Sequence, residues 1–209
     1  MKGLLNVCLV LFLILSQTAY AGSCFKDKDV DDCRVKSEQG IPDSQYNLGK
    51  MYYKGLGVPQ DYKEATKWTR LAAKQGHAKA QYNLGVMFER GQGVLQDYKE
   101  AVKWYRKSAE QGLPQAQYNL GVAYDIGQGV PQDDEEAVKW WRLAAEQGHS
   151  DAQNNLGRMY YLGQGVLQDY VMAHMYANIA AVSGSKSAIK GRGIVEKKMT
   201  QSQIEKAQD

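Results

Sequence analysis

Two serine–lysine pairs are the residues of this chain whose types and spacing come nearest to catalytic chemistry. Ser23 with Lys26, and Ser183 with Lys186, each fit the S-x-x-K pattern, in which a lysine one helical turn from a serine assists acyl transfer to its hydroxyl. The same chemistry needs S-D-N and K-T-G elements, and the sequence contains neither. We therefore expect both matches to be coincidental and the chain not to be an enzyme.

The three histidines do not suggest a metal site. His77 and His149 stand 72 residues apart in equivalent sequence contexts, and His174 has no histidine or cysteine near it in the chain. Metal sites in proteins need several ligands at short, characteristic spacings. We expect neither a metal nor any other cofactor.

Asparagine recurs with a strict period and is the best candidate for a binding group. Four asparagines, 36 residues apart, each precede a Leu-Gly pair: Asn47, Asn83, Asn119 and Asn155. An amide carries donor and acceptor groups, so a row of amides can pair with a peptide backbone of any sequence. A tyrosine, favoured at binding surfaces for its apolar ring and polar tip, precedes three of them: Tyr46, Tyr82 and Tyr118. The position three residues after each asparagine varies: Lys50, Val86, Val122 and Arg158. The alternative is that these asparagines and tyrosines only join neighbouring repeats.

The same period of 36 residues defines the helices that must position these groups. A leucine is followed four residues later by an aromatic residue, the spacing of one helix face, as in Leu48 and Tyr52. A glycine between them costs a helix about 1 kcal/mol relative to alanine. Its presence in every copy predicts a close approach of a second helix: Gly49, Gly85, Gly121 and Gly157. We predict a first helix over residues 45–53 and its copies.

The second predicted helix covers about residues 61–74 and its copies. An aspartate begins each one, where it can cap free N–H groups: Asp61, Asp97, Asp133 and Asp169. We expect the core to be filled by the aromatic residues Trp68, Trp104, Trp140 and Tyr176. A G-x-G-V turn with glycines suited to positive φ joins the two helices, and a Gln-Gly pair ends the first three units, at Gly76, Gly112 and Gly148.

Taken together, the A-Q-Y-N-L-G-x-x-Y first helix, the G-x-G-V turn, the D-Y-x-E-A-x-x-W second helix and the A-A-x-Q-G end resemble the Sel-one-like repeat (SLR), a relative of the tetratricopeptide repeat. The resemblance covers residues 44–184 and departs from the pattern at Asp134 and Asn154, where other copies have tyrosine. It implies an all-α, right-handed α/α solenoid of helix-turn-helix units at residues 44–79, 80–115, 116–151 and 152–184. It further implies that the first helices line a concave peptide-binding groove, faced by the four asparagines, the three tyrosines, Lys50 and Arg158.

Atypical segments flank the four units. Residues 22–43 are expected to form an N-terminal cap with a degenerate second helix at about 29–39. Residues 185–209 are expected to form a fifth first helix over 187–198 without its partner. A capping box from Thr200 to Gln203 then predicts a last short helix ending at Ala207.

The first 21 residues have the pattern of a secretory leader. A positive start at Lys2 precedes an apolar stretch over 4–15, and Ala19-Tyr20-Ala21 is a cleavage signal. We expect cleavage after Ala21 and a periplasmic or secreted chain without a membrane span. The two cysteines left after cleavage, Cys24 and Cys33, predict a disulfide in such an oxidising compartment. The alternative is a lipoprotein acylated on Cys24.

Charge is nearly balanced, at a formal +3, with both signs intermixed. A nucleic-acid surface would need one-sided positive charge, so no nucleic-acid partner is expected. The C-terminal segment is basic, through Lys186, Lys190, Arg192, Lys197 and Lys198, which is either a solvated cap or a contact for an acidic partner. We expect a monomeric, non-catalytic adaptor that binds a protein or peptide. The alternatives are an envelope enzyme acting on β-lactams or peptidoglycan, and a structural envelope-assembly factor.

Overall fold

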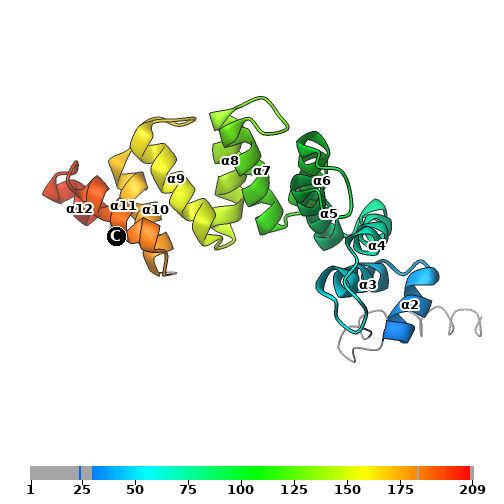
Figure 1. The fold of residues 1–209 in the computed structure, drawn as a ribbon. Helices are drawn as coiled ribbons and strands as arrows, with labels where there is room; N and C mark the ends of the chain where they lie inside the picture. The colour runs from blue at the N-terminus through cyan, green and yellow to red at the C-terminus, as the bar shows by residue number, and fades with distance from the viewer. Residues whose placement is uncertain (1–23, 25–29, 183, 208–209) are drawn as a thin grey trace, which may run out of the picture. The chain divides into compact units, whose positions relative to one another are not determined.

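The computed structural model describes residues 24, 30–182 and 184–207, and every regular element in these ranges is an α-helix (Figure 1). The predicted leader and the S-x-x-K serines, Ser23 and Ser183, lie outside the described residues. The chain forms two compact units, one ending at Gln96 and the other beginning at Asp97.

The first unit contains α2 (Val30–Glu38), α3 (Pro42–Lys54), α4 (Tyr62–Lys74) and α5 (Ala78–Arg90). Each helix packs against the next one along the chain. α2 is the degenerate second helix predicted before the first repeat. α3 and α4 are the two helices of that repeat, and α5 is the first helix of the next.

The second unit contains α6 (Tyr98–Glu110), α7 (Pro114–Ile126), α8 (Asp134–Glu146), α9 (Ser150–Leu162), α10 (Tyr170–Val182), α11 (Lys186–Glu196) and α12 (Gln201–Lys206). Consecutive helices from α6 to α11 pack together, and α11 also contacts α9. This is the helix-turn-helix packing of an all-α, α/α solenoid. α11 is the expected fifth first helix, and Thr200 and Gln203 form the expected capping box before α12.

The helix ends follow from capping chemistry. The side chain of Asp61 accepts hydrogen bonds from the backbone N–H groups of Lys63 and Glu64, and the three other aspartates cap their helices similarly. The first helices begin three residues earlier than predicted. Pro42 and Pro114 start two of them, because proline at the first helical position needs no N–H partner. Histidine side chains cap two others.

The periodic glycines lie at helix contacts, as predicted. A Cβ added to Gly49 would lie 2.6 Å from the Thr69 hydroxyl oxygen, and one added to Gly121 would lie 2.6 Å from the indole of Trp141. The second glycine of three turns, at Gly93, Gly129 and Gly165, makes a different contact: a Cβ on Gly129 would lie 2.3 Å from the carbonyl oxygen of Tyr98, in the preceding repeat. Any side chain at these positions would force the helices apart.

The predicted core position on the second helices was wrong by one residue. The most deeply buried position is occupied by Thr69, Tyr105, Trp141 and Ala177. Of the predicted residues, Trp140 is buried, at 7% exposed, whereas Trp68, Trp104 and Tyr176 are half-buried at the edge of the core. Trp68 and Trp140 donate their indole N–H groups to Glu64 and Glu136. The buried residues of α4 are Ala65, Thr66, Thr69, Ala72 and Ala73, so this face is centred on position 69 and position 68 lies at its edge.

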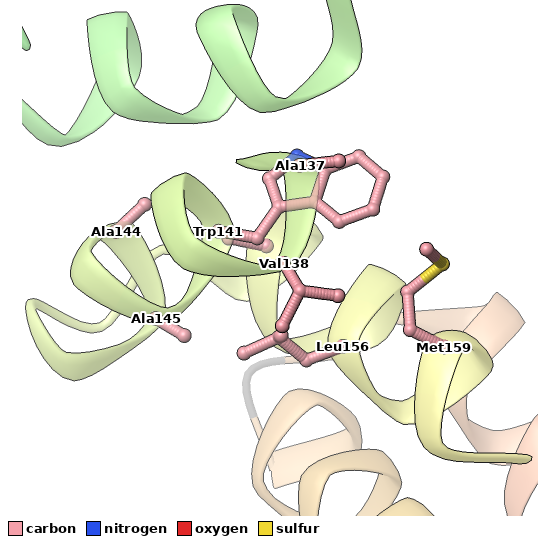
Figure 2. Packing of buried hydrophobic residues seen from close by; sticks show 8 residues of the cluster. Ala137, Val138, Trp141, Ala144, Ala145, Leu156 and Met159 are labelled. Atoms are coloured by element: carbon pink, nitrogen blue, oxygen red, sulfur yellow. The ribbon is translucent and has the colours of Figure 1, made fainter. Parts of the chain in front are cut away.

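In the second unit the core between α8 and α9 is well defined. Figure 2 shows Val138 of α8 directed toward Leu156 of α9, with Trp141 and Met159 beside them. All four side chains are buried. No helix in the described part of the chain is both long and apolar enough to cross a membrane.

Candidate functional site

Tyrosine, histidine and asparagine side chains join consecutive first helices within each unit. The ring of Tyr46 on α3 stacks on His77 at 4.6 Å between centroids, and its phenol is hydrogen-bonded to the side chain of Asn83 on α5. In the second unit Tyr118 stacks on His149 at 4.6 Å and is hydrogen-bonded to Asn155. Two of the four predicted groove asparagines thus already make a contact between repeats, as the alternative interpretation requires.

Burial shifts the ionisation of these groups. It raises the pKa of Tyr46 and of Tyr118 above the ordinary tyrosine value, although the hydrogen bonds from the asparagines act in the opposite direction. Burial likewise lowers the pKa of His77 and of His149. A neutral histidine suits the structure, because Nδ1 accepts the backbone N–H of Ala80 in one case and of Ala152 in the other.

The other predicted groove residues have different surroundings. Arg158 on α9 donates from Nη2 to both carboxylate oxygens of Asp125 on α7, at 2.8 and 2.9 Å. The amide of Asn47 lies 3.8 Å from the sulfur of Cys24. Lys50 is half-buried on α3, Tyr82 half-buried on α5 and Asn119 half-buried on α7. The structure brings Asn119, Asn155 and Arg158 onto the adjacent helices α7 and α9, but not all nine residues onto one surface of one unit.

A row of buried glutamines was not expected from the sequence. Each lies on a first helix and donates its side-chain N–H to a backbone carbonyl of the preceding repeat: Gln45 to Ser37, Gln81 to Ala73, Gln117 to Ala109 and Gln153 to Ala145, at 3.0–3.2 Å. These carbonyls belong to the ends of the second helices, which lack intrahelical partners. The recurrence of glutamine, a polar residue, at the same position of every first helix was the sequence signal that could have revealed this row.

The cysteines and the last repeat supply two further polar contacts. Cys24 and Cys33 are joined as a disulfide with a Cα–Cα distance of 5.0 Å, and both are buried against α3. The buried His174 of α10 lies 2.9 Å from a carboxylate oxygen of Glu196 on α11 and 3.1 Å from the amide of Asn178. This network attaches the C-terminal half-repeat. In the described part of the chain, no cluster of three or more histidine, cysteine or acidic side chains could hold a metal ion.

Family comparison agrees with the repeat boundaries seen in the helices. The Sel1 repeat model matches residues 42–77, 78–113, 114–149 and 150–185. The chain therefore belongs to the Sel1 repeat family, whose members are generally non-enzymatic adaptors that bind protein partners. No curated protein sequence matched the chain.

Solved structures of Sel1 repeat proteins are similar to this chain. The protein c5321, a protective antigen of uropathogenic Escherichia coli strains with an SLR fold, is 45% identical with a TM-score of 0.75 over 77% of this chain. This match spans only 34% of c5321. A Sel1 repeat protein from Oxalobacter formigenes is 37% identical with a TM-score of 0.75, over 80% of this chain and 71% of that one. The immunity protein Pa5087 from Pseudomonas aeruginosa, at 23% identity and a TM-score of 0.51 over 80% of this chain and 67% of its own, shares the fold alone.

Proposed function

We propose that this chain is a non-catalytic adaptor of the bacterial envelope or of a secreted fraction, and that it binds a peptide segment of a partner protein on its first helices. The observation that carries the proposal is the alignment of α7 and α9. The Tyr118–Asn155 and Asp125–Arg158 contacts set the two helices side by side. Asn119 and Asn155 occupy equivalent positions on these two helices, and both are half-buried.

The amides retain bonding capacity in this arrangement. An asparagine side chain has two N–H donors and an oxygen with two lone pairs, so the bond from Asn155 to Tyr118 leaves further groups for a ligand. Arg158 also has N–H groups beyond those that bind Asp125. The backbone of an extended peptide can therefore form hydrogen bonds with this face, and these bonds depend little on the sequence of the peptide. The envelope location is proposed from the leader-like residues 1–21.

Cross-linking in the native envelope, followed by purification of this chain, would identify the partner. With that partner, we expect Asn119→Ala to weaken affinity about two- to tenfold, since one lost hydrogen bond costs about 0.5–1.5 kcal/mol. The control is Lys67→Ala with Lys103→Ala, two exposed residues of second helices, which should leave affinity unchanged. Unchanged affinity of Asn119→Ala together with a lower melting temperature would mean that the asparagines only join repeats.

A further inference from the structure

A hollow of about 190 Å³ lies between α9 and α11, with α10 as its floor. The floor is apolar and consists of Ala173 and Ala177, and Ile194 forms part of the wall on α11. Arg158 and Tyr161 of α9 border it on the other side. Ile194 is 53% exposed and so presents apolar surface at the edge of the hollow.

The hollow exists because the last repeat carries smaller residues than the repeat before it. The position of Trp141 in the third repeat is taken by Ala177 in the fourth. Trp141 is fully buried, donates its indole N–H to the Tyr118 carbonyl at 3.2 Å and lies 6.0 Å from the Arg158 guanidinium. At the equivalent position Ala177 lines the hollow beside α11.

Two further substitutions widen the same place. Asn154 of the fourth repeat stands where the third has Tyr118, and Gly191 of the C-terminal half-repeat stands where the fourth has Asn155. Both line the hollow. A Cβ added to Gly191 would meet no atom within 4 Å, so the helix does not need glycine there for packing. Glycine at this position adds no side chain to the lining of the hollow.

The surroundings of the hollow are basic. Lys190 precedes Ile194 by four residues, so the two share one face of α11. Residues 186–206 contain six lysines and arginines against two glutamates. Of these two, Glu196 is engaged by His174 and lies 3.5 Å from Arg192. Among the contacts of the described residues, none pairs Lys186, Lys190, Lys197 or Lys198 with a carboxylate.

We propose that this hollow binds a bulky apolar side chain, of the size of leucine or phenylalanine, carried on an acidic segment of the partner protein. The inference rests on the proposed adaptor function and names the chemistry of its ligand. Apolar cavities of about 150 Å³ can bind benzene, so the volume suits one such side chain. The acidic residues on either side of it would meet Lys190 and its neighbours.

The test uses the full mature chain and fluorescein-labelled peptides of Asp, Glu, Ser and Gly with one central Leu or Phe, measured by fluorescence anisotropy. We expect the peptide to lose affinity when the central residue is Ser, and again when Asp and Glu are replaced by Lys. Gly191→Leu should fill the hollow and weaken binding roughly tenfold or more. Gly193→Leu is the matched control, because it adds the same side chain to the same helix, outside the lining and with no atom within 4 Å of its Cβ.

Charge is tested separately with Lys190→Glu, which should weaken binding, and with Lys99→Glu on α6, which should not. Absence of binding by the acidic Leu and Phe peptides, or equal binding to wild type and Gly191→Leu, would overturn the proposal. The photo-cross-linking residue benzoylphenylalanine, placed at position 194 or at position 119, distinguishes failure of this proposal from failure of the adaptor function. If the partner is captured from position 119 but not from position 194, the proposal for the hollow is wrong and the adaptor function stands. If the partner is captured from neither position, the adaptor function is wrong.

Discussion

At the scale of single residues, the repeats are joined by polar side chains whose hydrogen bonds depend on ionisation. First helices begin alternately with an apolar residue followed by proline, as at Ile41 and Leu113, and with a histidine cap, as at His77 and His149. At the proline starts, the ring fixes the backbone φ angle, and proline has no N–H group that would need a hydrogen-bond acceptor. The histidine version accepts a hydrogen bond on Nδ1 and therefore depends on a neutral ring.

This gives a pH-dependent contribution to stability. Because the pKa of His77 is lowered in the folded chain, the unfolded chain binds more protons as the pH falls through about 6.5, the ordinary histidine value. The contribution is present above that value and is lost at lower pH. Asp43, 3.1 Å from Nε2, opposes the effect without reversing it. We expect the free energy of unfolding to fall between pH 7 and pH 5, and His77→Asn with His149→Asn to make this dependence shallower.

Urea unfolding at a series of pH values measures this directly. Asparagine is a good cap and does not titrate in this range, so the variant should lose the pH dependence more than the stability at pH 7. An identical slope in wild type and variant would show that the histidines are not responsible.

At the scale of helices, the repeat depends on small residues at two kinds of contact. Gly121 allows α7 to approach α8 within one repeat, and Gly129 allows the turn to approach the start of α6 in the repeat before. The first contact sets the pairing of helices and the second sets the stacking of repeats. Leucines in the turns, by contrast, make no comparable contact, and Leu167 is 91% exposed.

We expect Gly121→Leu to destabilise the chain far more than Leu167→Ala. The added side chain would overlap the indole of Trp141 and lie near the Ala137 carbonyl, and overpacking of this kind costs about 1–3 kcal/mol or more. Truncation of an exposed turn residue is usually within about 0.5 kcal/mol. Thermal melts of the two variants give the order, and equal losses would contradict the close-approach argument.

At the scale of the whole molecule, each compact unit has its own set of stacked helices, and the two ends differ in how they are closed. At the N-terminal end the Cys24–Cys33 disulfide packs against α3 together with Leu48 and Met51. At the C-terminal end α11 is attached to α10 through the His174, Glu196, Arg192 and Asn178 side chains. In α11 Arg192 occupies the position of the buried leucines of the complete repeats, such as Leu156.

We expect the mature chain to begin at Gly22 and to carry the Cys24–Cys33 disulfide. The small-x-small signal at Ala19–Ala21 and the pair of remaining cysteines motivate this expectation. The bridge closes a short loop and should stabilise the chain by roughly 2–3 kcal/mol on the chain-entropy model. Intact-mass measurement of the exported protein with and without reductant checks both points. A lipid mass on Cys24, or two free thiols, would contradict the expectation.

Much of the fold could be predicted from the sequence because the same pattern of residues occurs in four copies. The 36-residue period located the glycine contacts, the aspartate caps and both terminal half-repeats. The family and the all-α solenoid followed from the same pattern. One copy of such a short helix pair would be ambiguous, but agreement between copies separates required residues from incidental ones.

The sequence by itself determined which segments are helical, to within three residues at the helix starts, and which positions repeat. Only the tertiary structure decided what those positions contact. It placed Tyr46 on His77 and Asn83, assigned the deepest core position to Trp141 in place of Trp140, and gave the glutamines to carbonyls of the preceding repeat. It also opened the hollow beside Ala177 and Gly191. The physical reason is that local spacing specifies one helix face, whereas contacts between helices depend on the combined sizes and polar groups of residues on different helices.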